Sequence, residues 1–166
     1  MIEGLTLHQA VEFAIKTEEL GQRVYRKLAD RFADEREIAE IFATLAQDEA
    51  RHEKQFRSLL PRVPPDEGIS NQEARSEYLR AMSLSQFFMG KGHLFGAFEE
   101  IGDRTDALVR AFELEKATVQ YYQAIEEVLG ENETLGEILA AEKEHMLRLL
   151  RVLMADAKFR GLADDF

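Results

Sequence analysis

The stretch Leu45–Phe56, which reads LAQDEARHEKQF, decides the fold class of this chain. It continues an apolar repeat at helical spacing, whose members are Ile38, Ile41, Phe42, Leu45, Phe56 and Leu59. Residues that recur every three or four positions form one face of an α-helix, and this face is apolar enough to be buried. Glu49 and His52 fall on the same face. The pattern therefore predicts a long helix that buries a carboxylate and an imidazole, and such burial needs a chemical reason.

Composition favours a single all-α domain that covers residues 1–166. With 45% hydrophobic residues, a chain of 166 residues is long enough for one continuous core. All the prolines lie between residues 61 and 65, so most of the chain is free of residues that break helices. The sequence contains no cysteine, which excludes disulfides, thiolate metal ligands and thiol catalysis. Any bound metal ion must therefore be held by nitrogen and oxygen atoms.

The charge and the N-terminal sequence argue against two classes of partner. The formal net charge is -11, whereas nucleic acids and anionic membranes both bind basic surfaces. The N-terminal sequence has no basic region followed by an apolar run. No stretch approaches the roughly 20 apolar residues of a membrane-spanning helix. We therefore expect a soluble, cytoplasmic protein with neither nucleic acid nor membrane as a partner.

Helix start and stop signals predict four main helices, at 7–32, 35–60, 105–129 and 135–158. Three starts resemble a capping box, in which a capping residue is followed three positions later by Glu or Gln: Thr6 with Gln9, Asp34 with Glu37, and Thr134 with Glu137. The third helix is expected to begin after Asp103 or Thr105 and to stop at Gly130. Because the links within each pair are short, each pair forms an antiparallel hairpin.

A long connection, residues 62–102, separates the two predicted hairpins. It exceeds the usual length of a helix-to-helix link in a bundle and contains a helical signal at 71–83. The sequence thus predicts a four-helix bundle of two hairpins joined by a long crossover, with the helices running up, down, down and up. An aromatic cluster in this connection, Phe87, Phe88, Phe95 and Phe98, is expected to pack over the bundle or against a second subunit. We expect a homodimer.

The two predicted hairpins repeat one pattern of polar residues. The first and third helices each carry a lone glutamate with a tyrosine seven positions later: Glu18 with Tyr25, and Glu115 with Tyr122. The second and fourth helices each carry a Glu-x-x-His motif: Glu49 with His52, and Glu142 with His145. Each motif follows its lone glutamate at a similar separation, which brings both to about the same height across the hairpin. The repeat predicts an internal pseudo-twofold axis.

These polar residues are typical of a metal site. Four carboxylates in one dry core cannot all stay ionised, because burying one unpaired charge already costs several kcal/mol. Two divalent cations would neutralise four carboxylates, and two neutral imidazoles would add nitrogen ligands without adding charge. Residues three apart lie on one face of a helix, so a Glu-x-x-His pair can present both side chains to one site. The alternative is a metal-free bundle, used as an interaction module, whose carboxylates share protons.

The repeated motifs resemble the ferritin-like di-iron or di-manganese carboxylate proteins. Three stretches, AIKTEELGQRVYRKLA, IFATLAQDEARHEKQF and LEKATVQYY, resemble the rubrerythrin group within that superfamily. The resemblance implies a ferritin-like fold and two iron ions, with manganese or mixed metals also possible. It implies as metal ligands Glu18, Glu49, His52, Glu115, Glu142 and His145, with Glu49 and Glu142 as bridges. It also implies that the phenols of Tyr25 and Tyr122 hydrogen-bond to ligand carboxylates.

The resemblance implies an oxidoreductase that reduces hydrogen peroxide or dioxygen at the metal pair. Rubrerythrins usually carry a rubredoxin-like domain with a four-cysteine iron site, which this sequence lacks, so we expect a separate electron-donor protein. Many also have a further glutamate three residues after the lone glutamate of the third helix, where this chain has Thr118, with Gly21 as its counterpart in the first helix. This difference weakens the peroxidase prediction. Iron oxidation for storage, a cargo protein without turnover, and a di-manganese catalase-like site are the alternatives.

Overall fold

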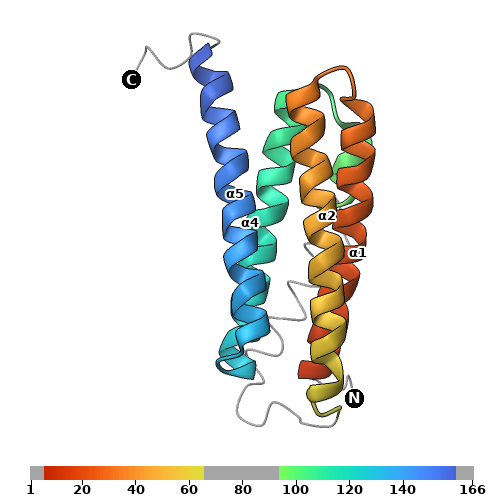
Figure 1. Cartoon of the computed structure of the whole chain (residues 1–166), viewed down its shortest axis with the longest axis vertical. Helices are drawn as coiled ribbons and strands as arrows, with labels where there is room; N and C mark the ends of the chain where they lie inside the picture. The colour runs from red at the N-terminus through yellow and green to blue at the C-terminus, as the bar shows by residue number, and fades with distance from the viewer. Residues whose placement is uncertain (1–5, 66–93, 160–166) are drawn as a thin grey trace.

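The computed structural model describes residues 6–65 and 94–159, which form an all-α bundle (Figure 1). In this part of the chain the long helices are α1 (Leu7–Arg31), α2 (Arg36–Leu59), α4 (Arg104–Leu129) and α5 (Glu133–Phe159). The short 3-10 helix η1 (Leu60–Arg62) follows α2, and η3 (Gly96–Glu100) precedes α4. The predicted all-α class and the two hairpins are confirmed. The helix predicted at 71–83 lies outside the described residues.

The four long helices run up, down, down and up (Figure 1). α1 packs along α2, and α4 packs along α5, so each hairpin is antiparallel. Between the hairpins, α1 contacts α4 and α2 contacts α5. Because α2 and α4 point in the same direction, the topology is that of a bundle with one crossover. All four helices therefore turn a face toward one shared core.

Side-chain caps begin three of the long helices, although not always at the predicted residue. Thr6 caps α1 in a reciprocal pair with Gln9, as the capping-box pattern predicts. Asp103 caps α4 by accepting a hydrogen bond from the backbone N–H of Asp106 at 2.9 Å. At the start of α5, the side chain of Asn132 accepts from the backbone N–H of Leu135 at 3.0 Å. The prediction that Thr134 begins this helix was therefore wrong.

The start of α2 also differs from the prediction. Glu35, not Asp34, is the N-cap residue, and its side chain makes no capping hydrogen bond. The reason is a tight turn after α1, in which the N–H of Glu35 donates to the carbonyl of Phe32 at 2.8 Å. This turn places the first helical residue two positions after Asp34. At the end of α4, Gly130 has a φ of 82°, a left-handed conformation that glycine adopts without strain, as predicted for a helix stop.

The core follows the predicted apolar faces of the four helices. Its largest fully buried apolar side chains include Phe42, Phe56, Leu108, Ile125 and Leu135. Two members of the predicted aromatic cluster, Phe95 and Phe98, pack against this core, whereas its other two members lie outside the described residues. Within residues 6–65 and 94–159, no helix is long and apolar enough to cross a membrane.

Candidate metal centre

The polar interruptions of the four helices meet near the middle of the bundle. α1 contributes Glu18, α4 contributes Glu115, α2 contributes Glu49 and His52, and α5 contributes Glu142 and His145. Each of these six residues is at most 4% exposed. Each Glu-x-x-His pair presents both of its side chains inward because residues three apart share a helix face. The fold thus brings together all six residues that the sequence pattern selected.

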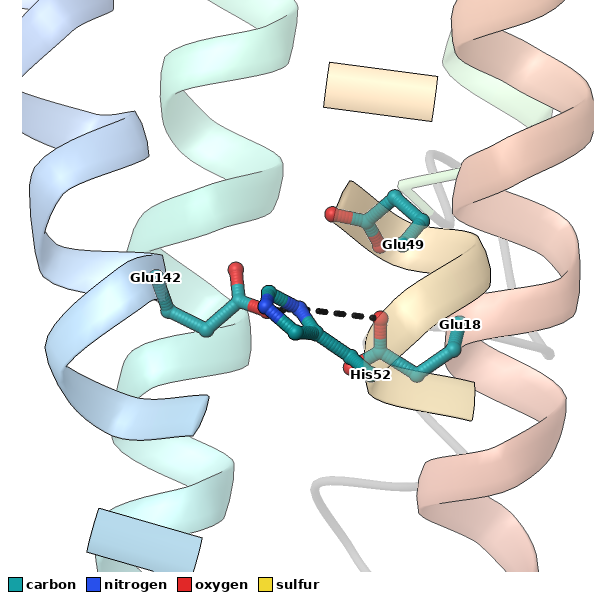
Figure 2. Close-up of side chains that lie close together, drawn as sticks. All are labelled: Glu18, Glu49, His52 and Glu142. Atoms are coloured by element: carbon teal, nitrogen blue, oxygen red, sulfur yellow. Dashed lines mark ion pairs between the residues drawn. The ribbon is translucent and has the colours of Figure 1, made fainter. Parts of the chain in front are cut away.

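The six side chains form two overlapping groups. The His52 group consists of Glu18, Glu49, His52 and Glu142, and the His145 group consists of Glu49, Glu115, Glu142 and His145. Within each group, one potential ligand atom of every residue lies within 4.8 Å of those of the others. Figure 2 shows the His52 group, whose side chains approach one another from α1, α2 and α5. Two glutamates, one on α2 and one on α5, belong to both groups.

Glu142 turns its two oxygens toward different histidines. Oε1 lies 2.6 Å from Nδ1 of His52, and Oε2 lies 3.4 Å from Nδ1 of His145. Nδ1 of His145 also lies 3.6 Å from Oε2 of Glu115 and 3.7 Å from Oε1 of Glu49. Donors bonded to one divalent ion at about 2.1 Å stand roughly 3–4 Å apart, so most of these separations suit a shared ion.

Two tyrosines support the lone glutamates, and each does so across the bundle. Tyr25 of α1 donates a hydrogen bond to Oε1 of Glu115 on α4. Tyr122 of α4 donates to Oε1 of Glu18 on α1. Both phenols are completely buried. Each tyrosine therefore fixes one oxygen of the glutamate in the other hairpin and leaves the second oxygen directed at the centre.

Several buried donor and acceptor atoms at the centre have no hydrogen bond of good geometry. Among the described residues, these atoms include Oε2 of Glu18 and Glu115, Oε1 of Glu49, both carboxylate oxygens of Glu142, both ring nitrogens of His52, and Nδ1 of His145. Buried polar atoms in folded proteins almost always have partners. Divalent cations bound by the two groups would satisfy these atoms, so the residues present fit a pair of metal ions.

Three of the four carboxylates of this centre resist ionisation when no cation neutralises them. Burial, reinforced by the charge of Glu142, raises the pKa of Glu115 to about 8. Burial likewise raises the pKa of Glu18 and, more strongly, that of Glu49. The cause is the cost of placing several negative charges in one dry space. Protons therefore occupy the centre when metal ions do not.

The histidines show the opposite balance. Burial alone would lower the pKa of His52, but the carboxylates of Glu142 and Glu18 raise it to about 10. The carboxylates of Glu115 and Glu142 likewise raise the pKa of His145 to about 11, against the effect of burial. Burial would raise the pKa of Glu142 itself, but the close approach of the His145 and His52 imidazoles lowers it below its usual range. One shared carboxylate thus stays ionised between two imidazoles.

One further residue, Asp48, contacts the centre and is not marked by the sequence pattern. Its Oδ2 lies 3.0 Å from Nε2 of His145, and its Oδ1 lies 2.9 Å from Nη2 of Arg51. Asp48 precedes the Glu-x-x-His motif of α2, so it lies off the apolar face that carries the six centre residues. Metal-bound histidines usually donate a hydrogen bond from their other ring nitrogen to a carboxylate. This tendency points to Asp48 only when α2 is known to pack against α5.

Gly21 provides space for one of the shared glutamates. A Cβ atom at this position would lie 2.5 Å from Oε2 of Glu49, which is too close to persist, and 3.2 Å from its Cδ, which is tight. The pseudo-symmetric position on α4 is Thr118, which is 3% exposed. Neither position adds a carboxylate to the centre. The two halves of the bundle therefore differ in the residue at this position, glycine in α1 and threonine in α4.

Comparison with known families agrees with this geometry. The rubrerythrin family model matches residues 9–86, a segment that includes most of α1, all of α2 and three of the six centre residues. The comparisons with curated proteins and with solved structures found no match. The second hairpin repeats the glutamate and Glu-x-x-His pattern of the matched segment. Residues 9–86 of the chain therefore match the rubrerythrin family, and the bundle shows a ferritin-like arrangement of two buried carboxylate and histidine groups.

Proposed function

We propose that the six centre residues bind two iron ions and that the protein is an oxidoreductase that reduces hydrogen peroxide or dioxygen. The observation that carries the proposal is the overlap of the two groups, which share Glu49 and Glu142. Shared carboxylates can bridge two ions, while Glu18 with His52 and Glu115 with His145 would complete the separate positions. Four carboxylates balance the charge of two divalent cations.

The residues around the centre have definable tasks in such a reaction. The bound iron pair would supply electrons to the oxidant. Tyr25 and Tyr122 would hold Glu115 and Glu18 in place, because each phenol donates to one of their oxygens. Burial raises the pKa of both phenols, so they stay protonated and remain donors. The apolar surroundings would keep bulk water away from the reacting atoms.

Electron delivery by a separate protein, a homodimeric state and a cytoplasmic location belong to this proposal. No cysteine occurs in the 166 residues, so a rubredoxin-type iron site cannot form within them. This supports an electron donor on another chain. Carboxylate and imidazole ligands suit manganese as well as iron, and the same centre could oxidise ferrous iron for storage. Metal content and reactivity must therefore be measured together.

The first experiment counts metal ions. The protein is loaded anaerobically with ferrous iron, desalted and analysed for iron per chain, beside the Glu142→Ala variant. We expect two iron ions per wild-type chain and loss of both in the variant, because Glu142 belongs to both groups. Glu144→Ala on the same helix is the matched control, since Glu144 is exposed and pairs only with Arg151 among its described neighbours. Iron-free wild-type protein that also binds no manganese would contradict the proposal.

The second experiment separates the reactions. The loaded, reduced protein is mixed with hydrogen peroxide or with dioxygen, and oxidation is followed by stopped-flow absorption. Rapid oxidation by peroxide with repeated turnover when reductant is supplied supports the oxidoreductase. A reaction with dioxygen alone would contradict the peroxidase form. Uptake of many more than two iron ions per chain would instead favour storage.

A further inference from the structure

The two histidines of the centre differ in what their outer nitrogens contact. His145 on α5 points Nε2 at Oδ2 of Asp48 on α2, 3.0 Å away. The other oxygen of Asp48 lies 2.9 Å from Nη2 of Arg51. A carboxylate paired with a guanidinium is an acceptor, so Nε2 of His145 carries the hydrogen. Once His145 loses its second proton to bind a cation, the neutral imidazole has its lone pair on Nδ1, which faces three carboxylates.

His52 lacks such a support. Neither of its ring nitrogens makes a hydrogen bond of good geometry to any described residue. The position that corresponds to Asp48, one residue before the glutamate of the second motif, is Ala141. Nδ1 of His52 lies 2.6 Å from Oε1 of Glu142, close enough for the two atoms to share a proton. No carboxylate lies this close to Nδ1 of His145. The pseudo-twofold symmetry therefore does not extend to the contacts of the outer ring nitrogens of the two histidines.

The two groups therefore differ in how well their ligand atoms are already spaced to bind a cation. Around Nδ1 of His145, the carboxylate oxygens stand 3.4 to 3.7 Å away, a spacing that leaves room for an ion between them. In the His52 group, a cation must first separate the 2.6 Å contact between His52 and Glu142. Because a carboxylate that accepts from the outer nitrogen also makes an imidazole a stronger ligand, both differences act in the same direction.

We propose that Asp48 is a positioning residue that makes the two metal positions unequal, so that the first divalent cation binds to the His145 group and the second to the His52 group. The inference rests on the proposed binding of two metal ions by the centre. It adds an order of filling and assigns it to one carboxylate outside the ligand set. Arg51 takes part by holding the carboxylate in place.

The test is a titration of the metal-free full-length chain with Co²⁺, followed by calorimetry and by visible absorption. We expect two binding steps of different affinity in the wild type. Asp48→Ala should weaken the first step by about 10- to 100-fold, as losses of such supporting carboxylates do, and leave the second step nearly unchanged. Asp48→Asn can still accept a hydrogen bond but lacks the charge. Its affinity for the first Co²⁺ should lie between those of the wild type and Asp48→Ala, and part of the absorption of the first Co²⁺ should return.

The control variant is Asp34→Asn, which makes the same chemical change at an exposed residue between α1 and α2. Thermal unfolding of the metal-free variants verifies that each one folds. Two equal steps in the wild type, an unchanged first step in Asp48→Ala, or equal weakening of both steps would overturn the inference. Failure of the wild type to bind two Co²⁺ ions would instead overturn the proposed function, so the two failures are distinguishable.

Discussion

Gly21 shows how one missing side chain shapes the centre. The substitution Gly21→Ala would place a Cβ atom 2.5 Å from Oε2 of Glu49, so the carboxylate must move. Because Glu49 belongs to both groups, we predict weaker binding of both metal ions, measured by Co²⁺ titration of the metal-free protein. An unchanged titration would show that Glu49 has another conformation that serves the centre equally well.

The chain offers a matched control for this substitution. Gly136 of α5 is also a helical glycine, but a Cβ atom there would meet nothing within 4 Å. Gly136→Ala should therefore show the usual gain of about 0.5–1 kcal/mol in the free energy of unfolding, with no effect on metal binding. The comparison separates the effect of helix propensity from the effect of displacing Glu49.

The buried tyrosines allow a second comparison of residues. Tyr25→Phe and Tyr122→Phe each remove the donor to a centre glutamate and leave a buried oxygen without its partner. We predict a loss of about 1–3 kcal/mol in the free energy of unfolding of the metal-free protein. Metal affinity should also fall, because the freed carboxylate is no longer held in place.

Tyr121 is the control for these two variants. It is equally buried, but its hydroxyl donates to the backbone carbonyl of Ala10 at 2.9 Å instead of to a centre carboxylate. Tyr121→Phe should reduce stability by a similar amount and leave metal affinity unchanged. If all three variants affect metal binding equally, the phenols act through general packing and not through the carboxylates that they contact.

Protonation of the centre makes metal binding depend on pH. The pKa values of Glu115, His52 and His145 are raised to about 8, 10 and 11, so these groups hold protons at pH 7 without metal. A bound cation must displace those protons, so metal affinity should rise as the pH increases from 6 to 8 and fall as it decreases. Calorimetry in buffers of different ionisation enthalpy measures the protons released. Binding without proton release would contradict this prediction.

At the scale of the helices, periodicity predicted more than the capping patterns did. The apolar repeats place all four long helices because burial of one face is a sum over many residues. The starts of α2 and α5 depend on single turns. The predicted capping residues were Asp34 and Thr134, whereas in the structure Glu35 and Asn132 immediately precede the two helices. A capping pattern competes with the turn that leads into the helix, and the sequence does not show which one prevails.

The centre was predictable for the same reason that the helices were. Its six residues lie on the apolar faces, so periodicity alone marks them as buried charges. Asp48 lies outside that pattern, because its contact with His145 depends on the packing of α2 against α5. The effect of Gly21 likewise depends on the distance between α1 and Glu49. Both are contacts between helices, and no spacing within one helix encodes them.

Arg104, the first residue of α4, ties three elements together at one end of the bundle. Its Nη1 lies 2.9 Å from Oε2 of Glu35, the N-cap residue of α2, and its Nε lies 3.0 Å from Oδ2 of Asp156 in α5. We predict that Arg104→Ala lowers the free energy of unfolding by about 1 kcal/mol, since these side chains are partly exposed to solvent. Chemical denaturation measures the change.

Two variants test whether the hydrogen-bond geometry of Arg104 with Glu35 and Asp156 matters for stability. Arg104→Lys should recover only part of the loss, because an ammonium cannot bind a carboxylate through two parallel hydrogen bonds. Arg36→Ala is the control, since Arg36 is fully exposed and pairs only with Glu40 within α2 among the described residues. Equal effects of the variants at positions 36 and 104 would mean that the cluster adds nothing beyond an exposed ion pair.

At the scale of the whole molecule, the centre connects the two hairpins. The described packing within each hairpin is extensive, whereas the hairpins contact each other through α1 with α4 and α2 with α5. Both groups draw residues from both hairpins, and the tyrosine bonds also cross between them. Metal ions bound at the centre would therefore crosslink the hairpins through their most buried polar side chains.

Metal removal should consequently destabilise the entire bundle. A ligand that binds only the folded state at 100 times its dissociation constant adds about 2.7 kcal/mol to the free energy of unfolding. For a chain of this size, 1 kcal/mol corresponds to roughly 2–4 °C in Tm. We therefore predict that a chelator lowers Tm by several degrees and that added ferrous or manganous ions restore it, as measured by calorimetry under anaerobic conditions. Glu142→Ala should show no response to either treatment, whereas Glu144→Ala should respond like the wild type. A wild-type Tm that is insensitive to both chelator and metal would mean that protons alone hold the four helices together at the centre.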